Sequence, residues 1–169
     1  MEYRVLTLWE PWATLVVHGI KKIETRLKPT SWTVEKGTYL IHTAKKWTMD
    51  QEKICTYNKY FRDELNKILP IIQIGHPYWK HYFEFGHIIG SVEVKECHEI
   101  FIDPLKDSYL HILNKTVAFY PTDTEIAFGD YTPGRYAWIL QNPRILETPI
   151  PYKGQQGFYP RFKGDFDKL

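Results

Sequence analysis

The sequence has little of what marks several large classes of protein. Only two cysteines, Cys55 and Cys97, occur among 169 residues, and they form no CxxC pair. A disulfide framework is therefore not expected, and a reducing cytoplasm is the simpler environment. No segment reaches the ~20 consecutive apolar residues that span a bilayer, and the start "MEYRVLTLWEPW" lacks the basic and apolar regions of a signal peptide. We expect a soluble cytoplasmic protein with no membrane partner.

Several catalytic and cofactor-binding motifs are also missing. The chain has no GxxxxGK[ST] loop and no GxGxxG loop, which disfavours nucleoside-triphosphate and dinucleotide chemistry. It has no GxSxG elbow, which disfavours the serine hydrolases that use one. Seven histidines are scattered along the chain, without zinc-finger or HExxH spacing. The sequence therefore predicts no cofactor and no metal site.

The composition that remains is that of an ordinary globular domain. Hydrophobic residues make up 43% of the chain and charged residues 25%, and the length suits one core, so we expect a single domain over 1–169. Aromatic residues are abundant at 16%, and flat side chains serve stacking as well as core packing. A formal net charge of +2 permits an anionic partner without requiring one.

Periodicity predicts alternating strands and helices. Residues 3–8 are expected to form a strand, followed by a helix that Glu10 and Pro11 open and Gly19 ends. The further expected elements are strands at 22–27, 37–43, 87–100 (bent or bulged at Gly90) and 135–141, a helix from the Thr48 and Gln51 capping box to Pro70, a short helix around 108–114, insertions near 70–86 and 103–124, and turns after 141.

Five motifs, in order along the chain, carry a family resemblance. They are a "PWA" helix, the spacing G-x-K-x-x-E-x-R, the strand end "HTAKK", the strand "GSVEV", and "GRYAW" followed by "KGQQG". In the second motif the four positions are Gly19, Lys21, Glu24 and Arg26. Together they resemble the ASCH domain family, relatives of the PUA RNA-binding domains, over roughly residues 3–160. A single G-x-K-x-x-E-x-R would be a far weaker match.

The resemblance implies an α+β fold, a small PUA-like β-barrel flanked by helices. It also implies a cleft between the barrel and the N-terminal helix that binds RNA or a modified nucleobase. Cations there suit phosphate or carbonyl oxygens, carboxylates suit exocyclic amino groups, and aromatic rings suit base stacking. The expected ligand-binding residues are Trp9, Trp12, Arg26, His42, Lys45, Asp130, Tyr131 and Arg135, and the expected catalytic ones are Lys21, Glu24 and Glu93.

Each of these residues also has a purely structural interpretation. Lys22, Glu24 and Arg26 alternate along a strand, and such charges are often only a solvated face. Trp12 is of a residue type that lies more often in a core than on a binding surface. Glu93 follows the alternation of its strand and is equally well explained as the outward residue of a half-exposed sheet.

One branch of the family resembles small amidohydrolases of acetylated cytidine nucleosides, which use a Lys, a Thr and a Glu. The Lys matches Lys21 and the Glu matches Glu93, but Glu24 stands where that branch has its Thr. A carboxylate cannot replace the nucleophilic hydroxyl, so hydrolysis here would use Glu24 or Glu93 to activate water, with Lys21 stabilising the oxyanion. Thr25 is adjacent, but in a strand it is expected to face away from Glu24.

Two further functions stay open on the sequence alone. Another branch of the family cuts single-stranded RNA without a metal, and Lys21, Tyr131 and Arg135 are of suitable types for that reaction. A protein-interaction module is the third possibility, because the aromatic stretch "YWKHYFEF" at 78–85 would be a docking patch if it were exposed. The identity of a protein partner does not follow from the sequence.

Overall fold

The computed structural model describes residues 2–27, 36–69, 78–101, 120–154 and 161–164. The elements are β1 (Glu2–Leu8), α1 (Trp12–Val17), β2 (Ile23–Arg26), β3 (Gly37–Thr43), α2 (Met49–Tyr57), α3 (Lys59–Ile68), the 3-10 helix η2 (Trp79–Tyr82), β4 (His87–Glu99), α4 (Asp123–Ala127), β5 (Tyr136–Pro151) and β6 (Arg161–Lys163). The predicted α+β class is confirmed.

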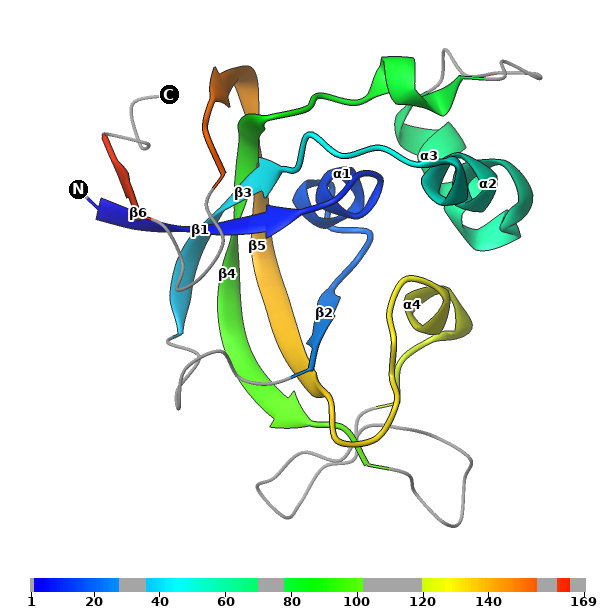
Figure 1. Cartoon of the computed structure of the whole chain (residues 1–169). Coiled ribbons are helices and arrows are strands. Elements are labelled where there is room, and N and C mark those ends of the chain that lie inside the picture. Colours follow the sequence, from blue (N-terminus) through cyan, green and yellow to red (C-terminus); the bar gives the residue numbers. More distant parts are fainter. Residues whose placement is uncertain (1, 28–35, 70–77, 102–119, 155–160, 165–169) are drawn as a thin grey trace.

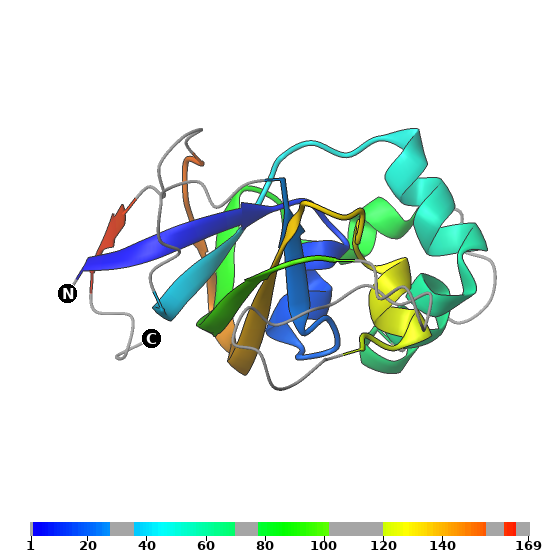
Figure 2. The same cartoon turned by 90° about the horizontal axis from the view of Figure 1, so that it is seen from below.

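One mixed sheet organises the molecule (Figures 1 and 2). Its strand order is β2-β5-β4-β3-β1-β6, in which β1 pairs with β3 in parallel and the other described pairs are antiparallel. Among the described residues no backbone pairing joins β2 to β6, so the closed barrel that we expected is not confirmed. A side chain makes one link across the opening, since Arg26 Nη2 on β2 donates to the carbonyl of Thr7 on β1 at 3.4 Å.

The strand β5 is much longer than the sequence predicted. We expected it to end at residue 141 because of the prolines and glycines that follow, yet it continues to Pro151. Gln141 pairs with Glu93 and Arg144 pairs with Ser91, which leaves Asn142 and Pro143 in a bulge with a shifted register. Proline lacks an N–H, and at a bulge none is needed for the ladder. The bulge therefore tolerates a residue that normally ends a strand.

The helices pack in layers on the sheet (Figure 1). One side of α1 contributes Ala13, Val16 and Val17 to the sheet core. The opposite side contributes Leu15 to a second cluster, which holds Phe61 of α3 together with other apolar side chains of the helical layer. The short helix α1 is thus buried between two layers, as its apolar composition predicts.

The predicted helix from Thr48 to Pro70 is two helices. Asn58 has extended backbone angles (φ −79°, ψ 112°), and its side chain accepts a hydrogen bond from Tyr60 N–H at 3.0 Å. Asparagine is a preferred N-cap residue, so it ends α2 and begins α3. The start of α2 is as predicted, with Thr48 N–H donating to Gln51 Oε1 at 2.8 Å.

The aromatic stretch at 78–85 is not the exposed docking patch that we considered. Trp79 and Phe83 are buried in the helical cluster, and Trp79 N–H donates to Glu52 Oε1 at 2.9 Å. Tyr78 is the large hydrophobic residue of this stretch that stays exposed. The stretch therefore contributes mainly to packing.

The remaining predictions can be compared only in part. The short helix expected at 108–114 lies outside the described residues, and so does most of "KGQQG". The helix α4 and the strand β6 were not expected. Within the described ranges, no helix is long and apolar enough to cross a membrane.

Candidate functional site

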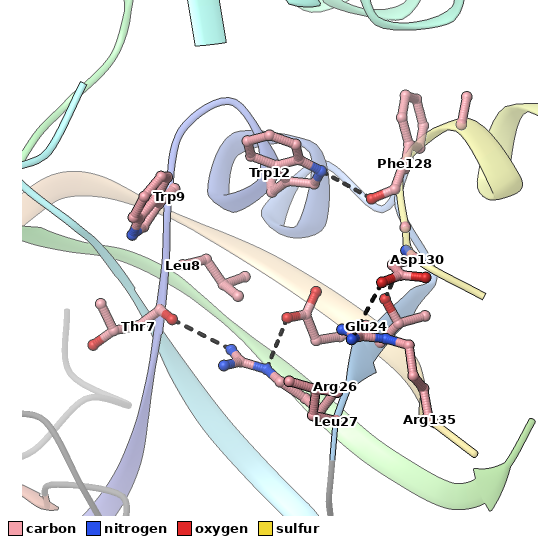
Figure 3. Close-up of a pocket in the computed structure, with 13 residues that line it drawn as sticks. Thr7, Leu8, Trp9, Trp12, Glu24, Arg26, Leu27, Phe128, Asp130 and Arg135 are labelled. Atoms are coloured by element: carbon pink, nitrogen blue, oxygen red, sulfur yellow. Dashed lines mark hydrogen bonds and ion pairs between the residues drawn. The ribbon is translucent and has the colours of Figure 1, made fainter. Parts of the chain in front are cut away.

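A cavity of about 930 Å³ opens where β1 leads into α1, beside β2 and the segment that joins α4 to β5. Its size lies within the range of small-molecule sites. Figure 3 shows side chains from all of these elements around it. The lining residues are Thr7, Leu8, Trp9, Trp12, Glu24, Thr25, Arg26, Leu27, Ala127, Phe128, Gly129, Asp130 and Arg135. Six of them are residues that the sequence predicted for the site.

The strand β2 supplies the first charged pair. Arg26 Nε lies 2.9 Å from Glu24 Oε1, and the two side chains share a face because they are two residues apart on a strand. Glu24 is buried, whereas Arg26 keeps about a third of its side chain exposed. The face of β2 that we considered to be only solvated therefore presents one buried carboxylate and one guanidinium to the cavity.

Lys21 lies behind this pair rather than in the cavity. Its side chain is 1% exposed, its Nζ lies 3.5 Å from Glu24 Oε2, and it donates a hydrogen bond to the carbonyl of Ile23. It lines a separate cavity of about 300 Å³. Because it is covered, Lys21 acts on Glu24 and on the start of β2, and it has no direct access to a ligand in the larger cavity.

Two tryptophans flank the cavity in different ways (Figure 3). Trp9 is 43% exposed, and the Lys46 ammonium lies over its ring, 4.8 Å from the centroid. Trp12 is half-buried, donates from Nε1 to the carbonyl of Phe128 at 2.8 Å, and meets Phe61 edge-on at 5.5 Å between ring centroids. Trp12 is thus both a core residue and part of the wall, and Trp9 is the accessible aromatic surface.

A second charged pair also lines the cavity. Arg135 Nη1 is 3.2 Å from Asp130 Oδ2. Hydrogen bonds from the hydroxyl and the backbone N–H of Thr132 to Asp130 lower the pKa of that carboxyl. Asp130 N–H in turn donates to Thr25 Oγ1 at 3.1 Å. We expected Thr25 to face away from Glu24. Both residues line the cavity, and the Thr25 side chain packs against Gly129, where its hydroxyl anchors the Asp130 loop.

Two residues expected to act in the site lie in other surroundings. Glu93 accepts hydrogen bonds from Gln141 Nε2 at 3.0 Å and from Asn142 Nδ2 at 2.5 Å, and it does not line the cavity. Tyr131 is buried in a hydrophobic cluster with Ile23, and burial raises the pKa of its phenol. Neither residue lines the cavity, although the charge of Glu24 acts on the Tyr131 phenol and helps to raise its pKa.

His42 and Lys45 also stand outside the cavity lining. The His42 ring is buried, bonds to Thr7 Oγ1 at 3.0 Å, and packs edge-on against Tyr152, and desolvation lowers its pKa. Lys45 is exposed, and its alkyl chain lies close above Gly86. The buried histidine is therefore accounted for by packing.

The structure adds Glu125, which sequence reasoning missed. This buried residue of α4 accepts hydrogen bonds from the backbone N–H groups of Lys22 and Ile23, both at 3.0 Å. Burial raises the pKa of its carboxyl, and the charge of Lys21 opposes that rise. Thr122 caps α4 through Glu125 N–H at 3.2 Å, and that T-x-x-E spacing was the available signal. Glu125 ties α4 to the start of β2.

The charges around the cavity compensate one another. Glu24 lies between Lys21 and Arg26, while Asp130 neutralises Arg135. Such a wall offers hydrogen-bond donors and acceptors side by side, which suits a polar ring with both kinds of group. Among the described residues, no three His, Cys, Asp or Glu side chains gather as a metal-binding set.

The family comparison covers the elements that build this cavity. A family model for the ASCH domain matches residues 6–150, which extend from within β1 almost to the end of β5. Lys21, Glu24 and Arg26 of the G-x-K-x-x-E-x-R motif belong to this span, and the structure places them in or directly behind the cavity wall. The chain therefore belongs to the ASCH domain family.

Proposed function

We propose that the cavity binds a nucleobase, either of single-stranded RNA or of a modified nucleoside. The observation that carries the proposal is the combination in one cavity of an accessible tryptophan, Trp9, with the ion pair of buried Glu24 and partly exposed Arg26. Membership of a family related to RNA-binding domains supports the same class of ligand. Unpaired bases are typically bound by stacking on an aromatic ring and by hydrogen bonds to their edges.

The lining side chains divide these tasks between them. Trp9 supplies a stacking surface, and base stacking on an aromatic ring contributes about 1–3 kcal/mol per base. Glu24 accepts hydrogen bonds from an exocyclic amino group, while Arg26 and Arg135 donate to carbonyl or ring nitrogen acceptors. The fixed Trp12 edge limits the depth to which the ring can enter. Bases with both donors and acceptors on one edge fit this pattern.

Calorimetric titration with the four ribonucleosides and N4-acetylcytidine tests the proposal. Trp9→Ala and Arg26→Gln should each weaken binding at least tenfold, because each removes a contact worth about 1.4 kcal/mol or more. Tyr57→Ala and Arg62→Gln are matched controls, since both remove an exposed side chain of similar chemistry that lies on the helical layer. No binding by any of the five nucleosides would refute nucleobase recognition by this cavity.

The salt dependence separates base recognition from phosphate attraction. A neutral base held by paired charges should bind with an affinity that changes little between 50 and 300 mM salt. Phosphate contacts would lower log K by roughly 0.7 per contact for each tenfold rise in salt. We expect the first behaviour for free nucleosides.

Hydrolysis of an acylated cytidine is a second candidate, favoured by one observation. Lys21 is an almost fully buried ammonium, with Glu24 at 3.5 Å and Glu125 acting on it electrostatically. Buried charge clusters are expensive for folding, and they occur often at reactive sites. In the reaction, Glu24 would take a proton from water, and the hydroxide would add to the acyl carbon. Glu24 would then return that proton to the N4 nitrogen, so that cytidine leaves as its neutral amine and acetic acid is released and ionises to acetate.

Incubation with N4-acetylcytidine distinguishes this reaction from binding alone. Turnover that is lost in Glu24→Gln and kept in the control Glu147→Gln, which alters an exposed carboxylate on β5, would support hydrolysis. Equal acetate release by all three proteins would assign the activity to a contaminant. A Glu24→Gln protein that binds acetylcytidine while wild type shows no turnover would restrict the cavity to binding.

A further inference from the structure

The cavity has no cation that is free to hold a phosphate group among the residues that the structure describes. Arg26 is already paired with Glu24 at 2.9 Å, and Arg135 with Asp130 at 3.2 Å. A phosphate that approached either guanidinium would therefore also approach the carboxylate paired with it. Like charges at that range destabilise binding, so the wall favours the uncharged part of a nucleotide.

An exposed lysine stands next to the cavity instead. Lys46 Nζ lies 4.8 Å from the centroid of the Trp9 ring, and Trp9 itself lines the cavity. Lys46 is exposed, and it makes no ion pair with any residue within the described ranges. Lys46 lies over one face of the Trp9 ring, which leaves the other face for a base. The phosphate of that base is carried one ribose away from the ring, within reach of a flexible lysine side chain.

The backbone on both sides of this contact is held in place. The parallel strands β1 and β3 pair up to Leu8 and Thr43, and Ala44 N–H continues the pairing by donating to the Leu8 carbonyl at 2.8 Å. Trp9 directly follows β1, and the segment with Lys46 follows β3. Both therefore start from the ends of neighbouring strands and lie side by side. Beyond Lys46, Trp47 Nε1 donates to Glu52 Oε2 at 3.1 Å and fixes the segment to α2.

We infer that the ligand is a nucleotide within a single-stranded RNA, with its base in the cavity and its backbone leaving over Trp9, where Lys46 contacts a phosphate. The inference rests on the proposed function, because it presupposes that the cavity binds a base. It adds a division of the site into two parts. The base is bound inside the cavity, where the charges are paired, and the phosphate is bound outside the cavity by one lysine. Lysine suits this role as a mobile point charge.

A plain surface cation–π contact is the alternative explanation of the Lys46 and Trp9 pair. Such a contact contributes about 0.5–1 kcal/mol to folding at an exposed site and involves no ligand. The two explanations differ in what the lysine does to binding. A phosphate contact makes Lys46 contribute more to the salt dependence of RNA affinity than an exposed lysine elsewhere on the surface does.

The test measures the affinity of labelled RNA pentanucleotides of A, C and U between 50 and 300 mM salt, with the free nucleosides titrated alongside. Lys46→Gln should flatten the slope of log K against log salt by roughly 0.7 for the pentanucleotides. It should leave the affinity for the free nucleosides unchanged. Lys36→Gln is the matched control, since this exposed lysine stands at the opposite end of β3 and should alter neither quantity.

The outcomes separate the two proposals. A Lys46→Gln slope equal to that of wild type, with nucleoside binding retained, would overturn the phosphate contact and leave base binding intact. The absence of binding by both nucleosides and pentanucleotides would overturn base binding as well. If Lys36→Gln flattened the slope of log K against log salt as much as Lys46→Gln does, the RNA would be attracted by the general surface charge and not by a contact beside Trp9.

Discussion

At the scale of single residues, the site is defined by which charges are covered. Lys21 and Glu24 were expected to contact the ligand together, but Lys21 is enclosed and Glu24 alone of the two reaches the cavity. Lys21 and Glu24 are three residues apart where the chain turns into β2, and this spacing predicts that their side chains are near each other. It does not predict which of them the rest of the chain will cover, because that depends on elements such as α4 that lie a hundred residues away.

Glu10 is a buried carboxyl whose ionisation should oppose folding. In the sequence it stands between Trp9 and Trp12. Its side chain is fully buried and accepts hydrogen bonds from the N–H and the hydroxyl of Thr14, both at 3.0 Å. Burial raises its pKa to about 8, against an ordinary value of 4.5. The folded state therefore holds this proton more tightly than the unfolded state does.

We predict that Glu10 makes the protein less stable as the pH rises. Its contribution is complete below pH 4.5 and is lost progressively up to about pH 8, by roughly 3–5 kcal/mol in all. Glu10→Gln stays neutral, so its free energy of unfolding should fall less over this range. Urea unfolding at pH 5, 7 and 9 measures the difference, with the exposed Glu147→Gln as control. Parallel pH curves for wild type and Glu10→Gln would contradict the prediction.

At the scale of the elements, local patterns predicted strand and helix starts better than their ends. The apolar and polar alternation predicted β3 at its observed bounds, and the Thr48 and Gln51 pair predicted the start of α2. The break between α2 and α3 at Asn58 was not predicted, because the helical spacing of apolar residues continues through it. The continuation of β5 beyond residue 141 was not predicted, because the bulge that accommodates Pro143 forms only when β5 pairs with β4.

Gly90 shows why the centre of the sheet depends on one residue without a side chain. A Cβ atom there would collide with the backbone carbonyl of Arg144 on β5, and it would lie 2.8 Å from Val17 Cγ1 of α1. The sheet and α1 approach each other through this position. The sequence predicted a bend or bulge at Gly90, and the register of β4 with β5 shifts there.

We therefore predict that Gly90→Ala destabilises the fold by about 2–4 kcal/mol, because overpacking against backbone cannot be relieved by a rotamer change. Thr38→Ala, at an exposed position of the neighbouring strand β3, should change stability by less than about 1 kcal/mol. Chemical denaturation of the two variants provides the comparison. An equal, small effect from both would show that α1 and β5 can move apart at no cost.

At the scale of the whole molecule, the family could be predicted from ordered motifs, whereas the site required the fold. Five motifs suffice because each marks a different strand or helix end, and all of them except the closing "KGQQG" lie within the residues 6–150 that match the ASCH domain. The site draws on β1, β2 and the segment after α4, which are distant in sequence. Glu93 was assigned to it because its strand motif matched, although its side chain faces Gln141 and Asn142.

The indole N–H signals of the tryptophans give the most direct test of nucleobase binding in this cavity. In a ¹H–¹⁵N NMR titration with ribonucleosides and N4-acetylcytidine, assigned by single Trp→Phe variants, the account predicts saturable shifts for Trp9 and Trp12. Trp138 is buried in the sheet core and Trp79 in the helical cluster, and because neither lines the cavity both should keep their positions, as internal controls. Unchanged Trp9 and Trp12 signals at saturating concentrations of every nucleoside, or shifts confined to Trp79 and Trp138, would contradict it.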